Sequence, residues 1–294
     1  MVPQHSLLSC ANGFGAQRKQ VDTAMVALRQ IYPQQNWIRI LKYLPVPELK
    51  TRDGLRLVIV KGTPSPWGQA AKAMIEYKGL SYTAGLQIPR VENVELLQWA
   101  GTNSGPVVAW NDEKPINNWL AILNLLERLE PDRSLLPADR ALRSDVIGLG
   151  NEICGELGLG WNRRLSLYRP AISSGAAPQA VVSMGRKYGY NDDDVSLAVA
   201  RQIAGLELLA QRLDRQHAQG SEYLVGDSLT AVDFYWAAFS TIFILPPADW
   251  VPLGADRRPM FATIEPEVAA AIAPSLIAHR DRILQQHFKL PMEF

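Results

Sequence analysis

The sequence has little of what builds disulfide-rich proteins or metal sites. Only two cysteines, Cys10 and Cys154, occur among 294 residues, and they form neither a CxxC pair nor a disulfide scaffold. Of the four histidines, only His279 and His287 share an expected helix. They stand eight residues apart, whereas a helical metal site uses the i, i+4 spacing. We therefore expect no metal, and we expect the reducing cytoplasm as the location.

The sequence also lacks an excess of charge of either sign and a long apolar run. Lys and Arg number 30 and Asp and Glu number 29, giving a net charge of +1, so there is no electrostatic reason to expect a nucleic acid or an anionic membrane as partner. No run approaches the roughly 18 apolar residues of a membrane-spanning helix. The short basic pairs Arg163–Arg164 and Arg257–Arg258 are expected on solvated faces. What remains is the composition of a globular chain with one large or two medium domains.

The first 53 residues do not show the alternating strand and helix pattern of the residues that follow. Apolar residues recur at helical spacing over 19–32, and a second apolar element follows over 37–44 before Pro45 and Pro47. We interpret residues 1–53 as an extension that docks on the main body.

Residues 54–130 alternate between strand and helix patterns. Leu55–Val60 is a β-branched run between two glycines, typical of a buried strand, and Trp67–Tyr77 is a helix with Gly79 as its C-terminal stop. The other expected elements are strands at 81–88, 105–110 and briefly near 115–116, and helices at 94–100 and from 119 onward. This order predicts a compact α/β unit with a mixed sheet.

After the linker Glu130–Arg133 the pattern is helical, which predicts an all-α domain over residues 138–294. Asn191 can cap a helix from Val195 to about His217, and the acidic residues 192–194 suit the positive end of that helix better than they suit a metal. Thr230 and Asp233 have the spacing of a capping box, and they open an apolar helix expected over Phe234–Leu245.

Several segments resemble the glutathione S-transferase superfamily in the order that the family has them. The capping box resembles that of the family's helical domain. Glu76–Tyr82 (EYKGLSY) resembles the family's "EEKGLPYE" turn into the second strand, and Gly105–Val108 (GPVV) resembles its "VPVL". Leu135–Pro137 resembles the family's interdomain "LLP", and the final helix at His279–Leu284 is similar to that of bacterial members. The resemblance covers residues 55–290. It implies a thioredoxin-like domain followed by a glutathione-transferase helical domain, with glutathione as co-substrate and a homodimer as the assembly.

The resemblance implies catalysis through a glutathione thiolate, and the loop after the first strand offers two hydroxyls for it. A free thiol has a pKa near 8.5, and a hydroxyl at a helix N-terminus can lower it. Ser65-Pro66-Trp67 resembles the family's "SPF", so Ser65 is the first catalytic candidate and Thr63 the second. Alternatively, Ser65 only caps the helix. The loop has no cysteine, which argues against thiol-transfer chemistry.

The same resemblance assigns glutathione binding to two further segments. Gly105–Pro106 matches the place where the family has a cis proline preceded by a residue that pairs with the glutathione backbone, so we expect a cis peptide there. At the start of the next helix the family has Glu or Gln followed by Ser, where this chain has Asn118 and Trp119. Trp119 lacks the hydroxyl and is expected to pack into the core. An alignment shifted by one residue would put Asn118 at the serine position.

Five glycines between Gly148 and Gly160 interrupt what the family has as a long helix. Glycine weakens a helix by roughly 1 kcal/mol relative to alanine, so the cluster indicates close packing, a break, or room for a ligand. Trp161 and Arg163 follow it and, with Trp67, are the candidate walls of a pocket for the second substrate. In the family this helix also borders the dimer interface.

Two functions follow from this sequence. The first is a glutathione-dependent transferase that conjugates a small apolar electrophile. The second is a non-catalytic binding or scaffold protein of the same fold, which the Asn118–Trp119 pair favours, whereas Ser65–Pro66 favours the enzyme.

Overall fold

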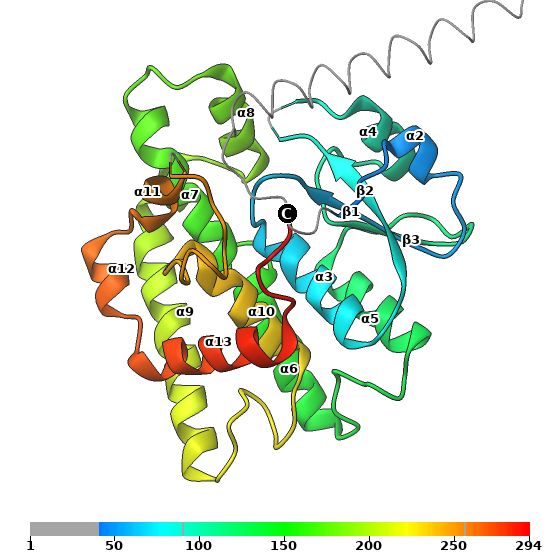
Figure 1. The fold of residues 1–294 in the computed structure, drawn as a ribbon. Coiled ribbons are helices and arrows are strands. Elements are labelled where there is room, and N and C mark those ends of the chain that lie inside the picture. Colours follow the sequence, from blue (N-terminus) through cyan, green and yellow to red (C-terminus); the bar gives the residue numbers. More distant parts are fainter. Residues whose placement is uncertain (1–40, 90, 256) are drawn as a thin grey trace, which may run out of the picture. The chain divides into compact units, whose positions relative to one another are not determined.

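The sheet of the α/β part has three strands in the order β2-β1-β3 (Figure 1). The computed structural model describes residues 41–294 except positions 90 and 256, so the helix expected over 19–32 lies outside the described residues. β1 (Leu55–Val60) pairs in parallel with β2 (Tyr82–Gln87), with Leu55 opposite Tyr82. It pairs antiparallel with β3 (Val107–Trp110). The expected strand near Ile116 is a single bridge to Val108.

The side chains of β1 alternate between the two faces of the sheet, and hydrophobic clusters cover both faces. Leu55, Leu57 and Ile59 join the main core, where α3 (Pro66–Tyr77) and α5 (Trp119–Leu129) contact each other. Val58 joins a smaller cluster on the other face. That cluster also holds residues of α2 (Val46–Leu49) and α4 (Val94–Ala100).

Residues 41–53 belong to the same unit as the rest of the described chain. Leu44 forms a parallel bridge with Gly85 of β2, and Pro45 and Pro47 open α2 instead of only ending an element. A Cβ on Gly85 would lie 2.3 Å from Leu49 Cδ2, so only glycine lets α2 approach β2 so closely. The boundary of the extension at residue 53 stays a prediction.

The second part is all-helical, as the sequence predicted. Its elements are α6 (Arg140–Cys154), α7 (Leu159–Ser173), α8 (Gln179–Lys187), α9 (Asp192–Ala218), α10 (Ala231–Phe239), η1 (Ser240–Ile242), α11 (Arg258–Ala262), α12 (Pro266–Ala270) and α13 (Pro274–His287). Every residue of α10 is buried. Among the described residues no helix has the length and apolarity to cross a membrane.

The helix expected over Phe234–Leu245 is shorter than predicted. It ends at Phe239 and continues as the 3-10 turn η1. The hydroxyls of Ser240 and Thr241 donate to Ala237 O and Ala238 O at 2.8 and 2.7 Å, and hydroxyls that bond back to the preceding turn in this way bend helices.

The two predicted helix caps are confirmed. Asn191 Oδ1 accepts from Asp194 N at 2.9 Å, and the capping box of Thr230 and Asp233 forms at the start of α10. Asp233 Oδ2 accepts from the N–H and the hydroxyl of Thr230 at 2.8 and 3.0 Å. Its other oxygen, Oδ1, accepts from Leu224 N and contacts His279 Nε2, both at 2.9 Å.

The glycine cluster interrupts the expected long helix and also allows close packing. α6 ends at Cys154 and α7 begins at Leu159, so the expected long helix is interrupted. A Cβ on Gly150 would lie 2.8 Å from the Trp119 ring, and one on Gly160 would lie 2.3 Å from the Phe239 ring. These two glycines let the aromatic rings of neighbouring helices approach the backbone.

Candidate functional site

Ser65 stands at the N-terminus of α3, directly after the loop that leaves β1. It is the N-cap residue and Pro66 is the first helical residue, a position where proline's fixed φ suits the helix. The Ser65 hydroxyl makes no capping hydrogen bond, and the side chain is partly exposed. The helix that begins here therefore does not use this hydroxyl, which stands at the positive end of α3.

Thr63 lies in the same loop, but its hydroxyl has a partner. Arg257 Nη1 donates to Thr63 Oγ1 at 2.8 Å and to Gly62 O at 2.6 Å. Arg257 precedes α11, so the helical part ties down the loop that carries Ser65. The expectation that Arg257–Arg258 lies on a solvated face was wrong, because Arg258 also donates to two carbonyls, Val251 O and Pro246 O.

Gly105–Pro106 lies beside the same end of the sheet. Its peptide bond is cis, as predicted. Gly105 N donates to Gln87 Oε1 at 2.7 Å. A Cβ on Gly105 would lie 3.4 Å from Ile59 Cα, and one on Gly68, in the first turn of α3, would lie 3.2 Å from Ile59 Cγ2. Gly105 and the start of α3 thus flank the same residue of β1.

The start of α5 is occupied by its own cap. Asn118 is exposed, and its Oδ1 accepts from Leu120 N and Ala121 N at 2.9 and 3.1 Å. Trp119 packs edge-on against Tyr235, with ring centroids 5.5 Å apart. The ring of Trp119 therefore serves packing between α5, α6 and α10, as the sequence suggested, and the side-chain amide of Asn118 is the polar group that remains.

Trp67 and Trp161, two of the candidate pocket walls, meet through a residue that sequence reasoning missed. Tyr188, which follows α8, has its ring centroid 6.2 Å from that of Trp67 and 5.1 Å from that of Trp161. Trp67 Nε1 donates to Cys154 O at 2.9 Å and its ring packs edge-on against Phe239. No pattern around Tyr188 marked it, because it reaches this cluster only through the packing of α7 and α8.

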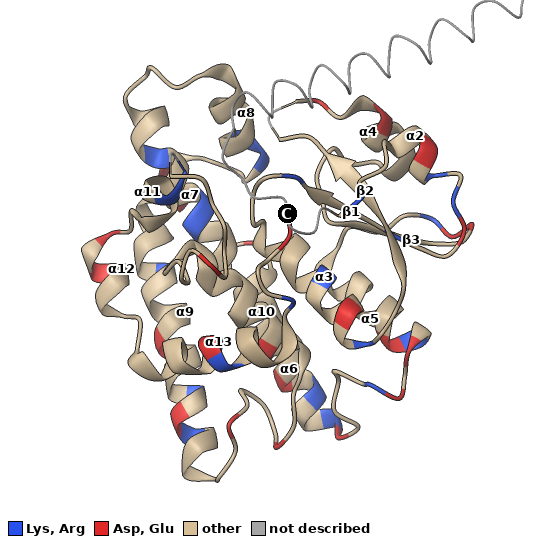
Figure 2. Ribbon diagram, viewed as in Figure 1, with Lys and Arg blue, Asp and Glu red and all other residues tan. Residues whose placement is uncertain are grey.

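Arg163, the third candidate wall, is buried in the helical part. Its side chain is 2% exposed, so the expected solvated face was wrong for this residue. Its Nε donates to Ile242 O at 2.8 Å, its Nη2 donates to Thr263 O, and its Nη1 lies 3.4 Å from Glu265 Oε2. Burial lowers the pKa of Arg163 to about 10 in spite of Glu265. The nitrogens of this guanidinium therefore hold helices together by hydrogen bonds. Figure 2 shows the basic residues of α7 in blue on the ribbon.

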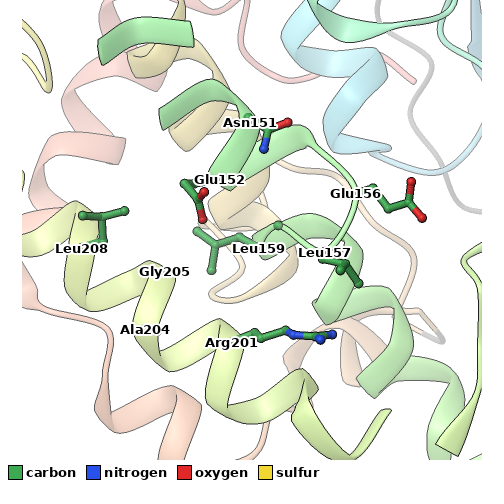
Figure 3. A pocket seen from close by; sticks show the side chains of 10 residues that line it. Asn151, Glu152, Glu156, Leu157, Leu159, Arg201, Ala204, Gly205 and Leu208 are labelled. Carbon is green, nitrogen blue, oxygen red and sulfur yellow. The ribbon is translucent and has the colours of Figure 1, made fainter. Parts of the chain in front are cut away.

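Two cavities of about 350 and 370 Å³ are hollowed between α6 and α9, and they share Glu152 and Leu208. Figure 3 shows the first, where Leu157 and Arg201 approach from different elements. Neither cavity is lined by Ser65 or Gly105. The candidate glutathione-binding residues therefore lie elsewhere, whereas Gly158 and Gly148 of the glycine cluster line the first and the second hollow.

Comparison with known proteins identifies the fold. No protein-family model and no curated protein matches the chain by sequence. Among solved structures, the beta-etherase LigF from Sphingobium sp. strain SYK-6 is similar with a TM-score of 0.54 at 17% identity, covering 78% of this chain and 94% of that one. Rice GST1 (OsGSTU1) in complex with glutathione is similar with a TM-score of 0.52 at 19% identity, covering 82% of this chain and 94% of that one. The chain has the glutathione S-transferase fold, with a thioredoxin-like part followed by a helical part.

Proposed function

We propose that this protein is a glutathione-dependent transferase in which Ser65 stabilises the glutathione thiolate. The observation that carries the proposal is the Ser65 hydroxyl, which stands at the N-terminus of α3 without a capping bond. A fold alone does not transfer a ligand or an activity. A thiol that accepts a hydrogen bond from a hydroxyl and lies at the positive end of a helix would be stabilised in its thiolate form.

In this proposal the other selected residues hold the two substrates. Gly105–Pro106 pairs with the peptide backbone of glutathione, and the start of α5, Asn118 with Trp119 behind it, receives the γ-glutamyl end. Trp67 and Trp161 form the wall for the electrophile, and Arg163 supports that wall from inside through its hydrogen bonds to carbonyls. Thr63 is the second candidate for the thiolate.

The proposed reaction forms one carbon–sulfur bond. The thiol first loses its proton to solvent. The thiolate then attacks the electrophilic carbon, and a leaving group departs with the bonding electron pair. Where the electrophile is instead an activated double bond, the carbanion formed takes a proton from water.

A non-catalytic binding protein is the second candidate function. It is favoured by Asn118 and Trp119, because the Asn118 Oδ1 is used by its own helix and Trp119 brings a packed ring where the family has a hydroxyl. Calorimetric titration with glutathione separates the two. We expect saturable binding with one site per chain, and absence of glutathione binding would favour the non-catalytic binding or scaffold protein.

We further infer that two copies of the chain pair through the face of α6 and α9. Leu157 and Leu208 border the first cavity between these helices while 41% and 39% exposed, and large exposed apolar side chains around a hollow are typical of interaction surfaces. Light scattering after gel filtration tests this, with Leu208→Glu expected to shift a dimer towards monomer. Leu97→Glu is the control, because Leu97 is 47% exposed on α4, away from this face. An unchanged mass for Leu208→Glu would contradict the assignment.

A further inference from the structure

Two neighbouring arginines on α7 have opposite surroundings. Each nitrogen of the Arg163 guanidinium has a partner, either one of two carbonyls or Glu265. Arg164 has no ion pair with a carboxylate among the residues that the structure describes. A guanidinium presents five donors, and the charge of Arg164 is not paired with any carboxylate of the described chain.

Arg164 interacts with the hydroxyls of two tyrosines, Tyr168 and Tyr188, instead. The rings of Tyr168 and Tyr188 have centroids 6.2 Å apart. Burial works against the charge of Arg164, but the hydroxyls of these tyrosines leave its pKa raised. The Arg164 Nε atom is buried and has no hydrogen-bond partner in the described structure. A buried donor without a partner is costly, and a ligand that accepts from it would remove that cost.

The position of this pair of tyrosines connects Arg164 to the candidate site. The ring of Tyr188 packs beside Trp67, which is two residues after Ser65, and beside Trp161. Lys187, the residue before Tyr188, donates to Asn103 Oδ1 at 2.6 Å and to Ser104 Oγ, and Ser104 precedes Gly105. The end of α8 thus spans from the loop before Gly105 to Arg164.

We propose that the second substrate carries an anionic group, a carboxylate, which binds the Arg164 guanidinium beside Tyr168 and Tyr188 while its apolar part lies against Trp67 and Trp161. This inference rests on the proposed transferase function and replaces a purely apolar electrophile with an aromatic acid. A carboxylate matches the planar donors of arginine, and the aromatic rings suit a flat apolar body.

Equilibrium binding of a matched pair of probes tests the inference without needing turnover. The probes are 4-nitrobenzoate and its methyl ester, which differ in charge but share the aromatic ring, and calorimetry gives each dissociation constant. Since hydrogen bonds to charged groups are the strong ones, we expect the wild type to bind the acid at least about tenfold more tightly than the ester. Arg164→Gln should abolish that preference and leave ester binding within about twofold.

The control and the rescue use the same helix. Arg169→Gln removes a positive charge from an exposed position of α7, and the preference should survive it. Arg164→Lys keeps the charge without the planar fork and should restore part of the preference. If Arg164→Gln does not fold, the wild type and Arg164→Lys still decide the question.

Three outcomes would overturn the inference: a wild type without preference for the acid, an equal loss in Arg169→Gln, or an Arg164→Gln variant that weakens glutathione as much as the acid. The last outcome would assign Arg164 to a carboxylate of glutathione itself. The glutathione titration reports separately on the proposed function. Binding of glutathione without a preference for the acid contradicts only the anion site, and absence of glutathione binding contradicts only the transferase.

Discussion

The starts of α10 and α3 are two helix N-termini that place a hydroxyl residue at the cap, and they use it in opposite ways. At α10, Thr230 and Asp233 are 1% and 0% exposed, and both oxygens of Asp233 have partners. At α3, Ser65 is partly exposed and its hydroxyl makes no capping bond. A saturated cap stabilises the fold, whereas an unsaturated one leaves the donor and the helix dipole to a ligand. Substitutions at the two sites should therefore separate stability from activity.

The largest effect is expected for Asp233→Ala. The change removes the acceptor for Thr230 N, Leu224 N and His279 Nε2 at once and leaves these buried groups unpaired. We expect the free energy of unfolding to fall by about 3 kcal/mol or more. Chemical denaturation measures it, and glutathione affinity of the remaining folded protein should be unchanged. A loss below about 1 kcal/mol would contradict a central structural role.

The start of α10 shows which contacts a local sequence pattern can predict and which it cannot. The spacing of Thr230 and Asp233 predicted the cap, because a capping box is a local motif. Nothing in the sequence indicated that His279 lies on the same carboxylate, since the two residues are 46 positions apart and meet only when α13 packs on α10.

Arg163 is a second case in which the local sequence did not predict a contact. Arginine is mostly exposed, so a solvated face was the natural expectation for Arg163. The structure buries it because Ile242, at the end of η1, and Thr263, after α11, leave carbonyls that need donors. These acceptors come from helix ends that lie far from Arg163 in the sequence, so a local sequence pattern cannot predict them. The candidate site is similar: Ser65 and Gly105 followed from motifs, whereas Tyr188, Arg257 and Gln87 required the fold.

Thr230→Ala should have an intermediate effect on stability. It removes the hydroxyl at the cap but keeps Asp233 and its bonds to Leu224 and the backbone of residue 230. Loss of an N-cap hydroxyl costs about 1–2 kcal/mol, so we expect a lowered midpoint of thermal unfolding and an unchanged active site. Thr230→Ser is the matched control and should restore most of the loss. Full stability with lost activity would show that the structural assignment is wrong.

Ser65→Ala should do the reverse of Thr230→Ala. Because the hydroxyl makes no capping bond, stability should change by less than about 0.5 kcal/mol. Losing its hydrogen bond to the thiolate should raise the pKa of bound glutathione by about one unit, which corresponds to roughly 1.4 kcal/mol. The bound thiol of the wild type ionises at lower pH, so turnover at neutral pH should fall about tenfold and the deficit should vanish at alkaline pH. Thiolate absorbance against pH measures this, and superimposable titrations would remove Ser65 from the mechanism.

The smallest effect is expected for Thr63→Val, which removes the second hydroxyl of the loop while keeping the shape of the side chain. Thr63 Oγ1 already accepts from Arg257 at 2.8 Å, and the same Arg257 nitrogen also donates to Gly62 O. The loop therefore keeps one of its two bonds to Arg257 when the hydroxyl is lost. We expect kcat/KM for glutathione conjugation to fall by no more than about threefold, less than 1 kcal/mol of transition-state stabilisation, with the thiolate titration unmoved. A displaced titration in Thr63→Val together with an unchanged one in Ser65→Ala would exchange the roles of the two hydroxyls and make the α3 cap a structural one like that of α10.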